Sequence, residues 1–184
     1  MKEKIIKILI PVIAVLVIAE SLVLLSKSLA PKTGPVQLPQ STKQPVTLKW
    51  DMATTSLKTG ITSEVPLIIT SDKDVSIDAV DLYIKYDPSM VTVSDAVTGK
   101  TFVTPSFKKV SQGKGMVVIN YLVSDAAGFK LKAGQSIVLV RLKVNYIKQG
   151  STQFSLGEGT LVVENATAKV LPFNNDKLVI NVSR

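Results

Sequence analysis

The sequence of 184 residues contains neither cysteine nor histidine. It therefore cannot form a disulfide, a zinc site made of Cys and His, or a nucleophile activated by a histidine base. Aromatic residues are also scarce, at 5% of the chain. A broad strip of exposed aromatic side chains, on which sugar rings could stack, is hard to build from so few. These absences exclude most common catalytic chemistries, and we expect no enzymatic activity.

Carboxylates alone could still support glycoside hydrolysis without histidine. However, most acidic residues beyond position 46 occupy turn sequences, where turn formation explains them. The stretch Asp72–Asp78 begins like a calcium-binding loop, but Ile77 stands where an EF-hand needs glycine and Tyr83 stands where it needs glutamate. We therefore expect no catalytic site, no metal-binding motif and no cofactor.

The net charge of +8 comes from 22 basic and 14 acidic residues, and its distribution is uneven. Residues 1–43 contain six lysines and two glutamates, which is half of the excess. The remaining charges are scattered, without a basic run. Nucleic-acid-binding proteins usually concentrate basic residues on one face. We therefore expect no nucleic-acid partner.

One long apolar run carries much of the chain's 46% hydrophobic content. Residues 8–25 would span about 27 Å as a helix, close to the thickness of a bilayer's hydrocarbon core. A leader with three lysines, residues 1–7, precedes the run and predicts a cytoplasmic start. Ser28 and Ala30 also fit a signal-peptide cleavage site before Pro31, which would give a secreted protein. Because the run exceeds a usual signal peptide, we favour an uncleaved, single-pass anchor in the cell membrane.

Residues 26–45 form a proline-rich segment with few apolar side chains, which predicts an extended spacer between the anchor and an extracytoplasmic domain. Glu20 lies inside the apolar run. We interpret it as a residue near the outer end of the helix that reaches toward water. The alternative is an assembly glutamate of a filament subunit.

From residue 46 onward, short alternating segments are separated by turn residues, which is typical of an all-β sandwich. We expect one domain, residues 46–184, and no internal repeat. The predicted strands are 46–50, 64–70, 76–86, 90–93, 106–110, 116–123, 136–146, 152–156, 160–163 and 177–182.

Alternation also assigns the faces of these strands. Val80, Leu82, Ile84 and Tyr86 are predicted to face the core. In residues 136–146, the positions Val138, Val140, Leu142, Val144 and Tyr146 share one face, whereas Ile137, Leu139, Arg141, Lys143 and Asn145 share the other. The strand at 116–123 is apolar on both faces, which predicts burial on both sides or an adhesive outer face.

The run from Asp81 to Val93, preceded by Gly60 and by residues 64–69, resembles the opening of a cohesin domain. Residues 115–121 and 134–144 fall where that family has its sixth and eighth strands. The resemblance covers about residues 46–184. It implies a nine-stranded jelly-roll β-sandwich, related to some carbohydrate-binding modules, that is exported and binds dockerin modules. In characterised systems such domains scaffold polysaccharide-degrading enzymes at the cell surface.

The resemblance further implies that the partner binds the outer face of the third, fifth, sixth and eighth strands. The partner-binding residues it suggests are Asp81, Tyr83, Lys85, Val118, Asn120, Leu122, Leu139, Arg141 and Lys143. Classical members often have an acidic residue after the sixth strand, where this chain has Ser124 followed by Asp125. The same face could also be merely solvated.

Two further functions are compatible with the sequence. A carbohydrate-binding module would bind polysaccharide, with Trp50 and Tyr83 as the plausible pair of surface aromatics. A surface adhesion or filament subunit would assemble through its apolar helix.

Overall fold

The computed structural model describes residues 44–165 and 167–184. The expected leader, the expected membrane helix with Glu20, the expected cleavage position after Ala30 and nearly all of the spacer lie outside these residues. In the described part of the chain, no helix is long and apolar enough to cross a membrane. The helical element found there is one short 3₁₀ turn, η1 (Gln112–Lys114).

Strands make up the rest of the regular structure. They are β1 (Val46–Trp50), β2 (Ser56–Lys58), β3 (Thr62–Ser71), β4 (Val75–Lys85), β5 (Val91–Thr98), β6 (Pro105–Ser111), β7 (Met116–Leu122), β8 (Phe129–Leu131), β9 (Ser136–Tyr146), β10 (Gly150–Leu156), β11 (Leu161–Glu164), β12 (Phe173–Asn175) and β13 (Leu178–Ser183). Every strand expected from the alternation is present. The additional strands β2, β8 and β12 have three residues each, too few for a periodic pattern to indicate.

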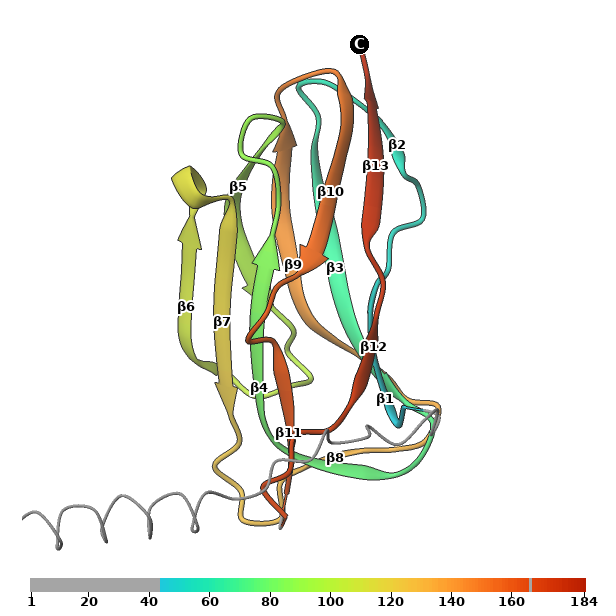
Figure 1. Ribbon diagram of the computed structural model, residues 1–184, viewed down its shortest axis with the longest axis vertical. Coiled ribbons are helices and arrows are strands. Elements are labelled where there is room, and N and C mark those ends of the chain that lie inside the picture. The colour runs from blue at the N-terminus through green and yellow to red at the C-terminus, as the bar shows by residue number, and fades with distance from the viewer. Residues whose placement is uncertain (1–43, 166) are drawn as a thin grey trace, which may run out of the picture. The chain divides into compact units, whose positions relative to one another are not determined.

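The strands form two sheets that lie face to face (Figure 1). The smaller sheet has the order β12-β1-β3-β9-β5, and the larger has the order β2-β13-β10-β4-β7-β6, with β8 and β11 also paired to β4. Most neighbouring strands are antiparallel and many are not consecutive in the chain. The fold is therefore an all-β sandwich, as expected, but the described residues form thirteen strands rather than the nine that the resemblance implied.

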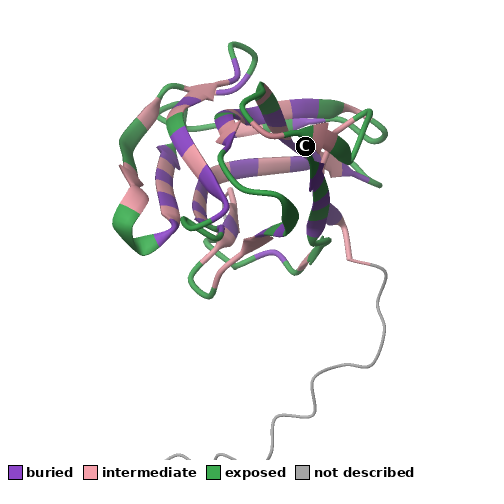
Figure 2. Cartoon of the chain, turned by 90° about the horizontal axis from the view of Figure 1, so that it is seen from above, coloured by how far each residue is buried: buried purple, intermediate pink, exposed green. Residues whose placement is uncertain are grey.

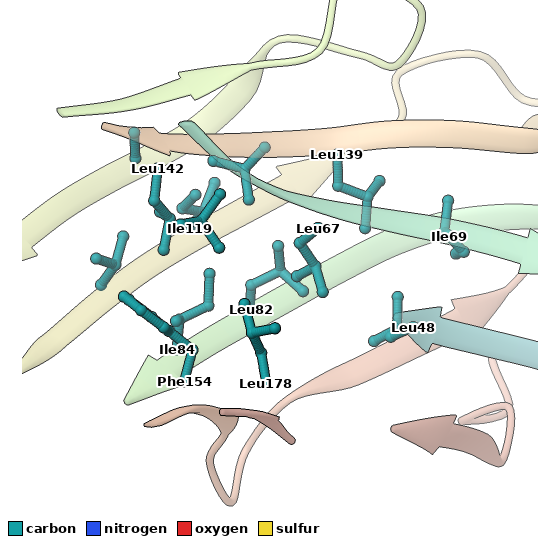
Figure 3. Packing of buried hydrophobic residues seen from close by; sticks show 14 of the residues in the cluster. Leu48, Leu67, Ile69, Leu82, Ile84, Ile119, Leu139, Leu142, Phe154 and Leu178 are labelled. Atoms are coloured by element: carbon teal, nitrogen blue, oxygen red, sulfur yellow. The ribbon is translucent and has the colours of Figure 1, made fainter. Parts of the chain in front are cut away.

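The core lies between the sheets and is built from alternate residues of each strand. Val80, Leu82 and Ile84 of β4 are fully buried, as predicted, and Tyr86 just beyond the strand is 7% exposed. Figure 2 shows buried and exposed positions alternating along the strands. In Figure 3, leucines and isoleucines from both sheets meet in the interior. Burial of these apolar side chains is the main force that holds the two sheets together.

Strict alternation fails at one position of β9. The pairing between β3 and β9 shifts so that Leu67 is opposite Val140, whereas Ile68 is opposite Val138. Leu139 is therefore the extra residue of a β-bulge, and its side chain is fully buried in the core (Figure 3). The prediction that Leu139 faces outward is wrong, because the bulge interrupts the alternation between Leu139 and Val140, and both side chains lie on the core side.

Candidate functional site

The outer side of β4 and β7 brings together six of the residues suggested as a binding site. The two strands are antiparallel, with Asp81 opposite Asn120 and Tyr83 opposite Val118. Ala79 is opposite Leu122, and Lys85 is opposite Met116. Because the intervening residues of β4 face the core, these side chains point away from it. Asp81, Tyr83, Lys85, Val118, Asn120 and Leu122 therefore share one surface of the larger sheet.

Three further strands extend this surface, which we call the β4–β7 face. On one side β10 and β11 pair with β4, and on the other side β6 pairs with β7. The register arranges the outward residues in four rows across the strands. Row 1 is Val170, Val163, Ala79 and Leu122; row 2 is Leu161, Asp81, Asn120 and Phe107; row 3 is Tyr83, Val118 and Lys109; row 4 is Ser155, Lys85, Met116 and Ser111.

Several apolar side chains of the β4–β7 face are open to solvent. Leu122 is 64% exposed, Val170 is 59% exposed and Phe107 is 48% exposed. Leu161 and Val163 of β11, on the same face, are half-buried. Single exposed apolar residues are normal on protein surfaces, whereas a contiguous group on one sheet is a candidate interaction surface. Rows 1 and 2 provide such a group.

A hydrogen-bonded polar pair lies in the middle of row 2. The Nδ2 atom of Asn120 donates to Oδ1 of Asp81 over 2.6 Å. Because this bond uses the amide nitrogen, Oδ1 of Asn120 and Oδ2 of Asp81 are left as acceptors. The centre of the β4–β7 face is therefore suited to a partner that donates hydrogen bonds, surrounded by apolar contacts.

The turn between β10 and β11 positions Tyr83 at the edge of this surface. The backbone N–H of Gly157 donates to the carbonyl oxygen of Tyr83 (2.6 Å), and the N–H of Tyr83 donates to Oγ1 of Thr160 (3.1 Å). Gly159 has a φ of +91°, and a Cβ there would lie 3.3 Å from the Tyr83 ring. The two glycines let the turn lie against Tyr83, which leaves the ring half-buried.

The three suggested residues of β9 do not belong to this face. Strand β9 lies in the smaller sheet between β3 and β5, so the expectation that it shares a sheet with β4 is wrong. Leu139 is in the core, and Lys143 lies opposite Glu64 of β3. The Nε atom of Arg141 is 3.7 Å from a carboxylate oxygen of Glu64. Arg141 and Lys143 therefore lie on the opposite side of the sandwich.

The resemblance implied that residues 136–146 lie on the same outer face as β4. In the structure, the neighbours of β4 on that side are β10 and β11, which both pair with β4. Residues of the β4–β7 face that sequence reasoning missed are Leu161, Val163 and Val170 on this side and Phe107 and Lys109 on the β6 side. Strands near residues 106–110 and 160–163 were predicted, and their alternation indicates outward positions. The alternation of apolar and polar residues does not indicate which strands these two strands pair with.

The acidic residue after β7 has a local role. Oδ1 of Asp125 accepts a hydrogen bond from the backbone N–H of Ala127 (2.8 Å), and its carbonyl oxygen accepts one from the N–H of Gly128 (2.9 Å). Asp125 thus stabilises its own turn, which is the usual function of aspartate in such sequences. The neighbouring Ser124 is exposed.

Among residues 44–165 and 167–184, no three Asp or Glu side chains are grouped so that they could hold a metal ion. Hydrogen bonds from Lys132 and Lys108 lower the pKa values of Asp74 and Asp95, respectively. These carboxylates are therefore held in the charged form and are unsuited to act as general acids at neutral pH.

The two aromatic residues considered for sugar binding lie on different sheets. Trp50 belongs to β1, packs against Phe154 with ring centroids 5.9 Å apart, and donates from Nε1 to the carbonyl oxygen of Asp176 (3.0 Å). Tyr83 belongs to β4 in the other sheet. They therefore form no common platform, and Trp50 is an edge residue of the core.

Comparison with known proteins identifies solved structures of the same fold. A type I cohesin–dockerin complex from Clostridium thermocellum, Coh-OlpA-Doc918, contains a chain that is 15% identical, with a TM-score of 0.63 and coverage of 76% of this chain and 99% of that one. The third cohesin of ScaC from Acetivibrio cellulolyticus, solved with the ScaB dockerin, is 18% identical, with a TM-score of 0.61 and coverage of 74% and 99%. A non-cellulosomal cohesin from the archaeon Archaeoglobus fulgidus is 13% identical, with a TM-score of 0.60 and coverage of 76% and 92%.

At such low identities these structures show a likeness of fold. No curated protein matches the chain. The family model of the cohesin domain, in contrast, matches residues 48–179, which is most of the sequence and most of the sandwich. The chain belongs to the cohesin domain family.

Proposed function

We propose that this chain is a non-catalytic module that binds a dockerin-type protein through the β4–β7 face. The observation that carries the proposal is the contiguous group of exposed apolar side chains in rows 1 and 2, centred on Asp81 and Asn120. Protein-binding interfaces bury apolar side chains together with a limited number of direct hydrogen bonds, and rows 1 and 2 offer groups of both kinds. The two cohesin structures from Clostridium thermocellum and Acetivibrio cellulolyticus were solved in complexes with dockerins, which supports the same class of partner here.

Binding of the full-length chain, kept in mild detergent, to a panel of purified dockerins tests the proposal by titration calorimetry. Leu122→Glu places a charge in the apolar row, and Asp81→Lys reverses the polar centre. Each change is expected to weaken binding by at least about tenfold, because Leu122 is the most exposed apolar side chain of the face and Asp81 belongs to its polar pair. Lys143→Glu, on the smaller sheet, is the matched control and should leave affinity unchanged.

Circular dichroism must show that each variant retains the β-sandwich. If Leu122→Glu and Asp81→Lys fold and bind as well as the unchanged chain, the β4–β7 face is not the binding surface. If the chain retains oligosaccharides and no dockerin, it is a carbohydrate-binding module and the proposal is wrong.

We further propose that the domain is displayed outside the cell by residues 8–25, with residues 26–45 as the spacer. The basic leader and the length of the apolar run support this arrangement. In this position the domain would recruit a dockerin-bearing protein to the cell surface, for instance an enzyme of polysaccharide degradation. The non-cellulosomal cohesin of Archaeoglobus fulgidus indicates that the fold also occurs outside cellulosomes, so other surface partners fit the same role.

A further inference from the structure

Charge is distributed unequally along the β4–β7 face. Row 1 consists of uncharged side chains only, and row 2 has a single charge, on Asp81, which Asn120 already contacts. Rows 3 and 4 contain Lys85 and Lys109. From strand spacing and rise, the Cα atoms of these two lysines are about 12 Å apart.

The two lysines of rows 3 and 4 are exposed and have no ion pair or hydrogen bond from their side chains among the described residues. A third exposed lysine, Lys114, is the last residue of η1 and lies two residues before Met116, the residue of β7 in row 4. Lys108 differs, because its Nζ atom bonds to Asp95 (3.1 Å) and to the carbonyl oxygen of Ala96 (2.9 Å). The cationic end of the face thus consists of Lys85, Lys109 and Lys114, which form no ion pair with acidic side chains among the described residues.

The acidic residues nearest in sequence do not compensate this end. Asp87, shortly after Lys85, accepts hydrogen bonds from the backbone N–H and the hydroxyl of Ser89, and Lys148 also lowers its pKa. Glu158 is exposed at the tip of the turn beside Tyr83. One acidic side chain at the edge leaves a positive excess over rows 3 and 4, and such an excess attracts and orients a partner of opposite charge.

We propose that the partner of the β4–β7 face carries acidic side chains over Lys85 and Lys109 and an apolar stripe over row 1. This inference rests on the proposed dockerin-type function and adds the chemistry and orientation of the partner. Turning the partner end for end would place its carboxylates over Leu122 and Val163, where they would lose water without gaining a cation. The polarity of the face therefore selects one orientation.

Selection from a library tests this inference. The dockerin Doc918 is displayed on yeast with its surface positions randomised, and the full-length chain in mild detergent is the bait. Clones that bind are expected to be enriched in Asp and Glu. They should bind the double variant Lys85→Glu with Lys109→Glu about tenfold more weakly than they bind the unchanged chain. This difference in affinity should become smaller at high salt, because salt screens exposed charges. Selection on that double variant should instead enrich Lys and Arg.

The matched control is Lys49→Glu with Lys177→Glu, which makes the same change of net charge away from the β4–β7 face. It should leave both affinity and the acidic bias unchanged. If the selected binders are not enriched in Asp and Glu, the inference is wrong. It is also wrong if the binders lose equal affinity for both double variants. Either result leaves the proposed function standing, because dockerins still bind. A library without any binder contradicts the proposed dockerin function itself.

Discussion

Gly99, directly after β5, lies against the backbone of β9 with no room for a side chain. Its N–H donates to the carbonyl oxygen of Leu139 (2.9 Å), and a Cβ on Gly99 would lie 1.8 Å from the carbonyl oxygen of Val138. We expect Gly99→Ala to cost about 1–3 kcal/mol of unfolding free energy, because backbone atoms at the bulge must move apart. Thermal unfolding followed by circular dichroism should show a clear fall in Tm.

Gly113 is the matched control for this substitution, since a Cβ there would meet no atom within 4 Å. Gly113→Ala should leave Tm nearly unchanged. If Tm falls equally in the two variants, the close contact with the bulge does not restrict the size of the side chain at position 99.

Tyr121 makes stability depend on alkaline pH. The side chain is 1% exposed, its hydroxyl donates to the carbonyl oxygen of Leu139 (2.6 Å), and burial raises its pKa. Above about pH 10 the unfolded chain loses this proton while the folded protein keeps it, so stability must fall as pH rises. The expected slope from this one group is up to about 1.4 kcal/mol per pH unit.

Urea unfolding between pH 8 and pH 11 measures this effect. Tyr121→Phe is expected to be less stable at pH 8, because it loses a hydrogen bond, but to lose less stability as pH rises. Tyr86 and Tyr146, whose pKa values burial also raises, remain in both proteins and supply the residual slope. Parallel curves for the two proteins would contradict the assignment to Tyr121.

At the scale of elements, η1 joins the β6–β7 pair to β5 through one glutamine. Oε1 of Gln112 accepts hydrogen bonds from the hydroxyl of Tyr86 (2.9 Å) and the N–H of Val93 (3.0 Å), and its Nε2 donates to the carbonyl oxygen of Val91 (2.9 Å). Removing the amide leaves these partly buried groups without partners. Gln112→Ala should therefore cost about 2 kcal/mol in urea unfolding.

Gln149 is an exposed glutamine in the connection between β9 and β10 and serves as the control. Gln149→Ala should change stability by less than about 0.5 kcal/mol. If both substitutions have equally small effects, Gln112 does not couple the two sheets.

The elements also show which parts of the structure are predictable from sequence. Alternation locates β4, β7 and β9 well, because burial on one face of a strand imposes a period of two. It fails at Leu139, since a bulge adds a residue without any change in composition. It also cannot decide sheet membership, because pairing of β4 with β7 and β11 depends on contacts between distant segments.

Prediction of the β4–β7 face from sequence has the same limits. Asp81, Tyr83 and Lys85, together with the outward residues of β7, could be placed correctly because they belong to two strands whose inward faces are clearly apolar. The prediction for Arg141 and Lys143 is wrong because β9 shows the alternation expected of a strand beside β4 but belongs to the smaller sheet. Leu161 and Phe107 were missed because their membership of the face depends on strand pairing alone.

At the scale of the whole molecule, the proposed anchor and spacer decide where the proposed binding through the β4–β7 face takes place. The spacer of residues 26–45, if extended, reaches about 60 Å, enough to hold the sandwich clear of the lipid headgroups. We expect the full-length protein to keep its leader, to stay in the membrane pellet after carbonate extraction, and to expose the sandwich to protease added to intact cells. N-terminal sequencing and fractionation check these points.

Val15→Arg with Val17→Arg is the sharpest perturbation of this arrangement, because each arginine near the centre of a membrane helix costs about 2.5–3.5 kcal/mol on insertion. The double variant should lose its hold on the membrane and its exposure to external protease. Lys32→Arg, within the spacer, keeps every charge and should change nothing.

A mature protein that begins at Pro31 and is found in the medium would show instead that the apolar run is a cleaved signal peptide. The β4–β7 face would then act on a secreted, diffusing module, and recruitment to the cell surface would require a second attachment that the partner must provide.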